Sequence, residues 1–219
     1  MKRRLRQMLA EGRFDAVTAE ATGATRVLGL LVTLTFDPDP AIAWRAVEAM
    51  GRAAAAIADR DPAPVRDHLR RLVWLLSEES GGICWRAPEA MAEVVRRRPV
   101  PFADFIPIVV HLLTETAEED LAHFRPGMLW AIGRLGPVAA GHVAEVLPAI
   151  TAALEHPDPR CRGMAAWTLG QIGRGDLLAE RPALAADDAE LTVYEHGHVR
   201  TTTVAALTRA ARDAAPAPD

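Results

Sequence analysis

An internal repeat of 41 residues constrains the fold of this 219-residue chain more than any other feature of its sequence. Each repeat has a leucine near the end of an apolar segment, at Leu31, Leu72, Leu113 and Leu154. A small residue follows as a second marker, at Gly51, Ala92, Gly133 and Gly170, with intervals of 41, 41 and 37 residues. A period near 40 residues predicts stacked units that bury their apolar faces only against their neighbours. We therefore expect all four leucines to be buried at equivalent positions.

The composition indicates that each repeat is a pair of helices. Half of the residues are hydrophobic, but only 5% are aromatic, and alanine and leucine dominate the apolar set. Alanine and leucine favour helices, whereas the β-branched and aromatic residues that favour strands are sparse before residue 191. Proline is tolerated where a helix begins but not in its interior. We therefore expect residues 37–40 and 157–159, which are rich in proline and aspartate, to be turns between one hairpin and the next.

The fourth repeat carries a resemblance to a known family. Residues 156–173 contain Arg162 eight residues before Gly170, together with the pair Leu169-Gly170. This pattern resembles the bacterial HEAT-like repeat that is also found in phycobilin lyase subunits. Arg125 matches the same arginine in the third repeat, whereas the first two repeats depart from the pattern at Ala43 and Cys84. The resemblance covers about residues 24–175 and implies an all-α, right-handed α-solenoid of HEAT-like repeats.

Two further segments resemble a small group of bacterial HEAT-repeat proteins of unassigned role. They are residues 79–90, which include Cys84-Trp85-Arg86, and residues 124–130, which include Arg125 and Trp130. This resemblance implies a fold and no function, because one fold serves many functions.

The two ends of the chain differ from the repeats, within what we expect to be a single domain. Residues 4–22 predict two short helices broken at Gly12, inside an N-terminal helical cap over residues 1–23. After four repeats over residues 24–175, the pattern changes to period two in residues 191–202, which predicts a β-hairpin with His196-Gly197 as its turn. A threonine-capped helix over about residues 204–212 follows, and residues 214–219 are expected to be a disordered tail.

We expect the hairpin and the last helix to form a cap over residues 176–213. The second helix of the fourth repeat has no full repeat after it, so its apolar edge needs a cover. The side chains expected to provide this cover are Leu191, Val193, Val199, Ala205 and Leu207.

Four of the five tryptophans fall on one stripe of the second helices. Trp44 and Trp85 lie seven residues before the small marker residue, whereas Trp130 and Trp167 lie three residues before it, which is one helical turn later. The candidate partner-binding residues are this stripe with its charged neighbours: Trp44, Arg45, Glu48, Trp85, Arg86, Glu89, Arg125, Trp130, Arg162 and Trp167.

Two interpretations of this stripe remain open. Tryptophan and arginine dominate many interface energies, so the stripe could receive a partner protein. The alternative is that the indoles pack between successive helices, because indoles bury large areas. Arg125 and Arg162 could likewise reach back to cap the preceding hairpin or pair with an acid of an adjacent repeat.

Charge and composition limit the possible partners. The net charge is −4, which offers no general attraction to a phosphate backbone and disfavours nucleic acid as a partner. Arg66, Arg70 and Arg71 with His68, together with residues 96–98, could make a local basic surface or simply be solvated helix faces. No apolar stretch suggests a membrane span or a signal peptide, so we expect a cytoplasmic protein.

Enzyme motifs give little support to catalysis, and we predict no catalytic, cofactor or metal site. No histidine precedes a glutamate as in the HEAT-like deoxyhypusine hydroxylases, and Glu195, His196 and His198 surround a turn where side chains diverge. Trp85-Arg86 and Trp44-Arg45 are distantly similar to the cleft lining of HEAT-like alkylpurine DNA glycosylases. The sequence therefore predicts a non-catalytic protein-interaction or scaffolding module, with a DNA-repair-type enzyme as the alternative. It leaves the partner and the oligomeric state open.

The two cysteines should remain unbridged. Cys84 and Cys161 belong to second helices two repeats apart, and helices packed about 8–10 Å apart would place their Cα atoms on the order of 20 Å from each other. A disulfide requires a Cα separation below about 7 Å. Electrophoresis of the folded protein after mild oxidation should show no intramolecular link, and the appearance of one would contradict the repeat spacing.

Overall fold

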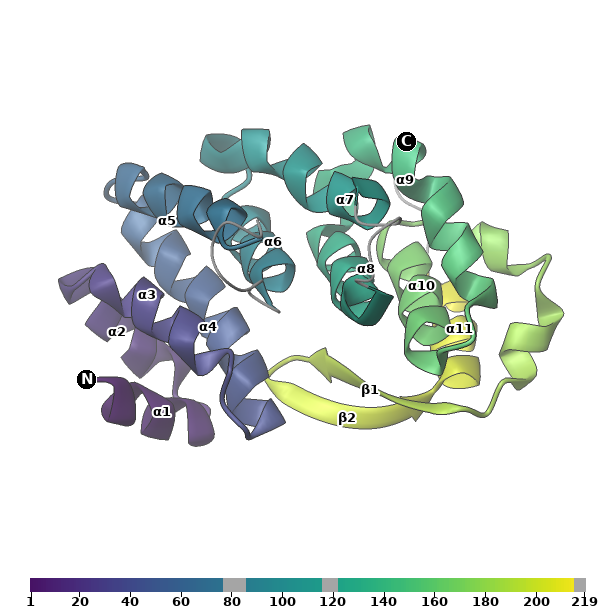
Figure 1. Cartoon of the computed structure of the whole chain (residues 1–219), viewed down its shortest axis with the longest axis horizontal. Coiled ribbons are helices and arrows are strands. Elements are labelled where there is room, and N and C mark those ends of the chain that lie inside the picture. Colours follow the sequence, from purple (N-terminus) through teal and green to yellow (C-terminus); the bar gives the residue numbers. More distant parts are fainter. Residues whose placement is uncertain (77–85, 116–121, 215–219) are drawn as a thin grey trace. The chain divides into compact units, whose positions relative to one another are not determined.

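The computed structural model describes residues 1–76, 86–115 and 122–214, and helices make up most of them (Figure 1). These residues group into two compact units. Unit 1 contains Met1–Phe105 together with the short segment Tyr194–Val199. Unit 2 contains Ile106–Val193 and Arg200–Asp219.

Unit 1 is built of helices that alternate between first and second members of a hairpin. Its elements are α1 (Lys2–Ala10), α2 (Phe14–Gly23), α3 (Arg26–Leu34), α4 (Pro40–Ala58), α5 (Ala63–Trp74), α6 (Ala87–Arg97) and η2 (Val100–Phe105). The second helices form a continuous row, because α4 packs against both α2 and α6. Gly12, with φ of 67°, ends α1 and starts α2, which confirms the two short N-terminal helices.

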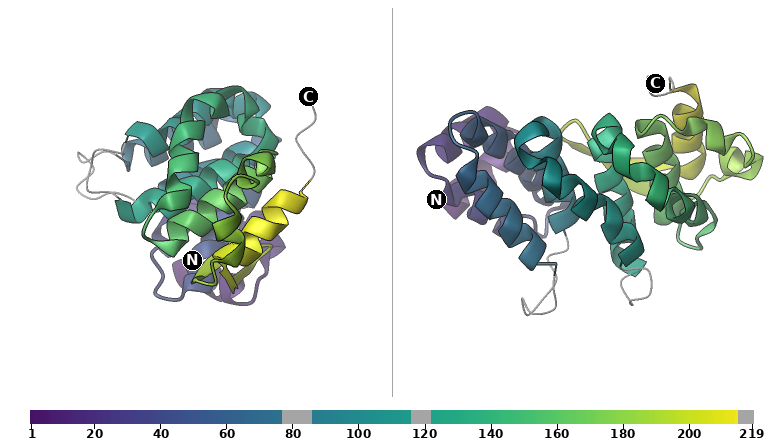
Figure 2. Two further views of the ribbon diagram at one scale, coloured as in Figure 1. Left: turned by 90° about the vertical axis from the view of Figure 1, so that its right-hand side faces the viewer. Right: turned by 90° about the horizontal axis from the view of Figure 1, so that it is seen from above.

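Unit 2 continues the same alternation and adds the C-terminal elements. The hairpins contain α7 (Ile106–Glu115), η3 (Ala122–Phe124), α8 (Arg125–Leu135), η4 (Gly136–Ala139), α9 (Ala140–Ala152), η5 (Ala153–Glu155) and α10 (Pro159–Gln171). They are followed by η6 (Gly175–Leu178), η7 (Pro182–Ala186), β1 (Glu190–Glu195), β2 (His198–Thr203) and α11 (Val204–Asp213). The second helices α8 and α10 lie side by side, and α11 packs against α10 (Figures 1 and 2).

The four repeated leucines are all buried, as the period predicted. Leu31, Leu72 and Leu113 lie in α3, α5 and α7, and Leu154 lies in η5, which extends α9. Their exposed fractions are 0, 1, 3 and 1%, respectively. The same period therefore places the same side chain in the core of four successive hairpins.

The proline-containing turns lie inside the hairpins, so the prediction that they separate one hairpin from the next was wrong. Asp39 caps α4 by accepting a hydrogen bond from the Ala41 amide at 2.9 Å, and Pro40 is the first helical residue. Asp158 caps α10 in the same way, accepting from the Arg160 amide at 2.8 Å. Each aspartate therefore marks the start of the second helix of its repeat, because the first backbone N–H groups of a helix have no acceptor within the helix.

The small marker residues are explained by close approaches between successive second helices. A Cβ atom built on Gly51 would lie 2.5 Å from the Glu93 carbonyl oxygen of α6, and one built on Gly133 would lie 2.4 Å from the Trp167 ring of α10. A Cβ atom on Gly170 would lie 2.7 Å from the Ala211 Cβ of α11. Therefore α11 takes the place that the second helix of a fifth repeat would take.

The predicted β-hairpin and its following helix are confirmed. The turn residues His196 and Gly197 have φ of 50° and 82°, which is the geometry of a two-residue hairpin turn. Thr203 caps α11 by accepting a hydrogen bond from the Ala206 amide at 3.1 Å. The four expected cover residues that belong to unit 2 are buried: Leu191, Val193, Ala205 and Leu207.

The end of the hairpin departs from the expected cap. Val199 is only half-buried, and with Tyr194 and the turn residues it belongs to unit 1. We call Tyr194–Val199 the hairpin tip. The sequence predicted that the whole hairpin covers the fourth repeat. Alternation of apolar and polar residues shows which face of the hairpin is apolar, but it does not show which helices that face packs against.

The run Arg125–Glu155 has the length and hydropathy of a membrane-spanning segment, although the sequence alone suggested no such stretch. The run is interrupted at Gly136, which has φ of 56°. Consequently α8 and α9 have 11 and 13 residues, each well short of the roughly 20 that cross a bilayer.

The close approach of α10 and α11 predicts a size limit at position 170. Gly170→Val should lower the free energy of unfolding by about 2 kcal/mol, because the added methyl groups meet the Ala211 backbone and force the helices apart. Gly141→Val in α9 is the matched control, since nothing lies within 4 Å of a Cβ atom there. Urea unfolding followed by circular dichroism would measure both, and equal effects would contradict the close packing.

Candidate functional site

The structure divides the candidate partner-binding residues into two groups. Trp44, Arg45, Glu48, Arg86 and Glu89 lie in unit 1. Arg125, Trp130, Arg162 and Trp167 lie in unit 2. Trp85 and Cys84 fall outside the described residues, so their predictions stay as they are.

The two indoles of unit 2 are core residues. Trp130 and Trp167 are 1% and 5% exposed, and their rings stack in parallel with centroids 6.3 Å apart. They fill the interface between α8 and α10, beside the close approach at Gly133. In this conformation neither ring is available to a partner. Their position matches the packing interpretation of the stripe, because indoles contribute most when large areas are buried.

Arg162 organises the start of its own helix. Its guanidinium donates to the carbonyl oxygens of His156 and Pro157, each at 2.8 Å, and to the Asp187 carboxylate at 2.8 Å. The Arg162 hydrogen bond lowers the pKa of Asp187. Arg125 lies half-buried at the first position of α8. The predicted role of Arg162 in capping and pairing fits its three contacts: two with backbone carbonyls before α10 and one with the Asp187 carboxylate.

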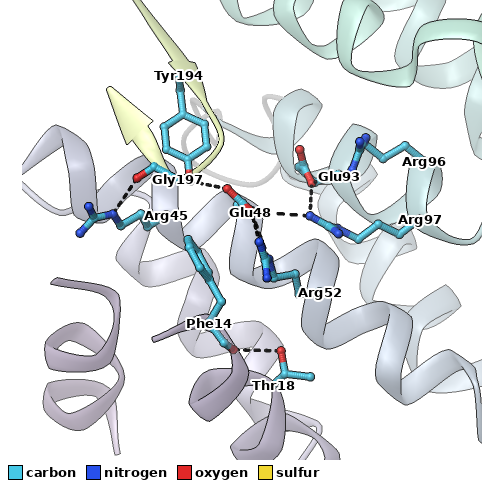
Figure 3. Close-up of polar contacts among 10 residues, drawn as sticks. All are labelled: Phe14, Thr18, Arg45, Glu48, Arg52, Glu93, Arg96, Arg97, Tyr194 and Gly197. Atoms are coloured by element: carbon cyan, nitrogen blue, oxygen red, sulfur yellow. Dashed lines mark hydrogen bonds and ion pairs between the residues drawn. The ribbon is translucent and has the colours of Figure 1, made fainter. Parts of the chain in front are cut away.

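In unit 1 the hairpin tip contacts members of the other group, and Figure 3 shows its hydrogen bonds with Arg45 and Glu48. Tyr194 stacks on Trp44 with ring centroids 5.3 Å apart and planes 5° apart. The Arg86 guanidinium carbon lies 4.0 Å from the centroid of the same Trp44 ring. Arg45 donates from Nε to the Gly197 carbonyl at 2.9 Å and from Nη1 to the Leu9 and Ala10 carbonyls. The tip is thus held by an aromatic ring and a guanidinium from α4.

Glu48 is the buried carboxylate at the centre of this group. Only 3% of the residue is exposed, yet both oxygens have partners. Oε2 accepts from the Tyr194 hydroxyl at 2.7 Å, and Oε1 accepts from Arg52 Nη2 at 2.7 Å, with Arg97 Nη2 at 3.8 Å. Burial alone would raise the pKa of Glu48, but the bonds from Tyr194 and Arg52 outweigh it and lower the pKa overall. Glu48 is therefore a buried anion at neutral pH.

Glu89 occupies the equivalent position of the next repeat but lacks this compensation. The residue is 2% exposed, its Oε1 lies 3.4 Å from Arg86 Nη1, and its Oε2 has no hydrogen-bond partner among the residues that the structure describes. Burial raises the pKa of Glu89, with Arg86 opposing the rise. Glu93, one turn later and fully buried, lies 3.2 Å from Arg97. Glu48 and Glu89 thus occupy the same core position in successive repeats, but the pKa of Glu48 is lowered and that of Glu89 is raised.

A groove crosses the row of second helices beside Glu48. It has a volume of ≈ 460 Å³ and is lined by Asp15 and Thr18 of α2, by Arg52, Ala55, Ala56 and Asp59 from α4 and its C-cap, and by Arg97 and Arg98 at the end of α6. We call it the arginine groove. A smaller hollow of ≈ 280 Å³ adjoins it, shares Asp15 and Arg52 with it, and is also lined by Phe14. The Arg52 guanidinium carbon lies 4.5 Å from the Phe14 ring centroid.

The arginines of unit 1 are mostly neutralised by nearby acids. In the groove, Arg98 pairs with Asp59 at 2.6 Å, while Arg52 and Arg97 contact Glu48 and Glu93. For the arginines of α5, the interpretation as a solvated helix face fits better than a basic binding surface, because Arg66 pairs with Asp104 and Arg70 with Asp67. Burial lowers the pKa of His68 to about 4, so this histidine adds no charge.

Tyr194 was missed by the sequence analysis, although it completes the site. It is the chain's single tyrosine, it is 1% exposed, and it lies 146 residues from its partner Glu48. One signal could have pointed to it. An acid at a core position requires a donor, and a lone tyrosine beside a hairpin turn is a suitable one.

The opposite surroundings of Glu48 and Glu89 predict opposite effects of the same substitution. Glu48→Met should lower the free energy of unfolding at pH 7 by about 2 kcal/mol or more, because it removes charged hydrogen bonds and takes away the acceptor of the buried Tyr194 hydroxyl. Glu89→Met should raise it, because an under-compensated buried charge is replaced by an apolar chain of similar length. Urea unfolding of both variants would measure this contrast.

The pH dependence provides the control. Glu48 has a lowered pKa in the fold, so its contribution to stability is present at neutral pH and is lost as the pH falls through the folded pKa. Glu89 has a raised pKa, so its cost is present above the folded pKa and disappears on acidification. The stability difference between Glu89→Met and the wild type should therefore shrink toward low pH. A difference that stays constant would contradict the assigned direction.

Comparison with known proteins supports the repeat assignment. Residues 122–172, from η3 to the end of α10, match the family model described as HEAT-like repeat. An uncharacterized protein of Archaeoglobus fulgidus is 32% identical over 108 residues, which cover 49% of this chain and 53% of that relative. The chain thus spans about half the length of this relative. No solved structure matches the chain. The phycobilin-lyase type of repeat stays a prediction, whereas the match supports a HEAT-like repeat over residues 122–172, within the helical hairpins of unit 2.

Proposed function

We propose that the chain is a non-catalytic protein-interaction module and that the arginine groove of unit 1 is its partner-binding surface. The observation that carries this proposal is the groove of ≈ 460 Å³ across three successive second helices. HEAT-like repeats commonly offer such extended surfaces to other proteins. The proposal includes the cytoplasmic location expected from the sequence.

The lining of the groove favours a protein partner. Ala55 and Ala56 leave room for an inserted side chain, and Thr18 and the charged rim supply polar contacts. Arginine is frequent at interface hot spots because its flat guanidinium stacks and donates in several directions. Arg52 already stacks on Phe14, with its side chain 38% exposed. A partner segment that carries both an apolar side chain and polar groups would complement this lining.

The charge pattern disfavours the alternative of a DNA-repair-type enzyme. Binding to a DNA duplex relies on cations that neutralise many phosphates. In the groove, Arg52, Arg97 and Arg98 each already face a carboxylate, and Asp15 and Asp59 lie on the same lining. The groove is therefore mixed in charge, and the whole chain carries a net charge of −4.

Site-specific photocrosslinking tests the proposal. A benzophenone amino acid at Ala56, in the groove, should form a covalent adduct with one partner protein in cells of the source organism. The same probe at Ala144, which is exposed on α9 of unit 2, is the matched control and should give no such adduct. Mass spectrometry of the adduct would identify the partner.

A second step separates true recognition from accidental contact. Ala56→Trp should fill the groove and weaken the purified partner's affinity at least tenfold, about 1.4 kcal/mol, whereas Ala144→Trp should leave it unchanged. Adducts of equal yield at both positions, or equal affinities of both variants, would contradict the proposal. Excision of alkylated bases by the purified chain would favour the DNA-repair alternative instead.

A further inference from the structure

The hairpin tip rests on residues that also shape the arginine groove. Tyr194 contacts Trp44 and Glu48, and the Gly197 carbonyl accepts from Arg45. Gly197 also lies against Phe14, since a Cβ atom on Gly197 would be 3.4 Å from Phe14 Cε2. The tip is thus seated by side chains of α2 and α4.

Two routes lead from the tip to Arg52. In the first, Tyr194 holds Oε2 of Glu48, while Oε1 of the same carboxylate holds Arg52 at 2.7 and 3.1 Å (Figure 3). In the second, Gly197 lies against the Phe14 ring, and Arg52 stacks over that same ring at 4.5 Å. Glu48 and Phe14, which both contact the Arg52 guanidinium, therefore also contact the tip. Arg52 in turn lines both the arginine groove and the adjoining hollow.

We propose that the hairpin tip is a latch that sets the shape of the arginine groove through Glu48 and Phe14. With the tip docked, the Glu48 carboxylate is fixed at both oxygens and presents Oε1 to Arg52. When the tip leaves, Oε2 loses its donor and Phe14 loses its cover, so that the carboxylate and the ring can reorient. Arg52 then moves with them, and the groove changes shape. The inference rests on the proposed function for its biological use, but the coupling itself needs no partner.

The position of the tip in the chain suits a latch. The tip belongs to unit 1, whereas the residues that precede and follow it in the sequence, Val193 and Arg200, belong to unit 2. Its contacts with α2 and α4 include one ring stack, one hydroxyl hydrogen bond, one carbonyl acceptor and one glycine contact, and these four are made by Tyr194 and Gly197. Small changes at Tyr194 or Gly197 can therefore release it without altering the packing between the helices of unit 1.

The coupling can be read from the arginine side chains by nuclear magnetic resonance. Arg52 Nε donates to Glu48, whereas Arg98 Nε donates to Asp59 at 2.6 Å on the same groove. Tyr194→Phe removes only the hydroxyl that reaches Glu48. In the full-length chain labelled with ¹⁵N-arginine, this variant should shift the Arg52 Nε–H signal and weaken its protection from exchange, and it should leave the Arg98 signal in place. Arg52→Lys assigns the signal.

A second variant tests the other route. Gly197→Ala places a side chain at φ of 82° against Phe14 and should lift the tip without touching Glu48 directly. It should shift the Arg52 signal as Tyr194→Phe does, while His198→Ala, at an exposed residue of β2, should not. Hydrogen exchange of residues 194–199 reports whether the tip has been released. An unchanged Arg52 signal in a folded variant whose tip is released would overturn the latch. Because no partner is present, this result is independent of the crosslinking result at Ala56.

Discussion

The second helices α4, α8 and α10 each approach the following helix of their own unit at one glycine, and this close approach constrains the neighbouring positions. At Gly51, Gly133 and Gly170 the helices leave no room for a Cβ atom. The residue three positions earlier, almost one turn back, is consequently buried in all four repeats, with 3, 2, 1 and 5% exposed at Glu48, Glu89, Trp130 and Trp167. This one position is a core position whatever residue the sequence places there.

Unit 2 fills this core position with indoles, whereas unit 1 fills it with carboxylates. The two indoles stack on each other in parallel. A buried carboxylate needs donors, because the loss of its hydration must be offset by hydrogen bonds and opposite charge. Glu48 obtains its donors from Arg52 and from the hairpin tip, and its pKa falls. Among the described residues, Glu89 has a long contact to the Arg86 side chain, and burial raises its pKa. The polar site of unit 1 therefore results from the placement of acids at a packing position.

The features that could be predicted from the sequence are those that depend on local patterns. The 41-residue period repeats one local apolar pattern, and the turn at His196-Gly197 and the capping threonine of α11 each act within a few residues. The docking of Tyr194 on Glu48 could not be predicted, because it joins residues 146 apart and leaves no periodic trace. The tryptophan stripe could also be predicted, because it follows from the spacing of residues along a helix. The burial of its indoles could not, because it depends on how closely neighbouring helices approach each other.

The one-turn shift of the indoles is the physical difference between an indole buried between two helices and an indole that the hairpin tip contacts. Three residues before the marker, an indole such as Trp130 lies between two second helices and is almost inaccessible. Seven residues before the marker, Trp44 lies one turn outside that contact and is only half-buried. Tyr194 and Arg86 contact its ring, since aromatic and cationic groups stabilise an indole that the core does not enclose. The vacated core position holds Glu48, so a single shift creates both the ring that seats the tip and the carboxylate that links it to Arg52.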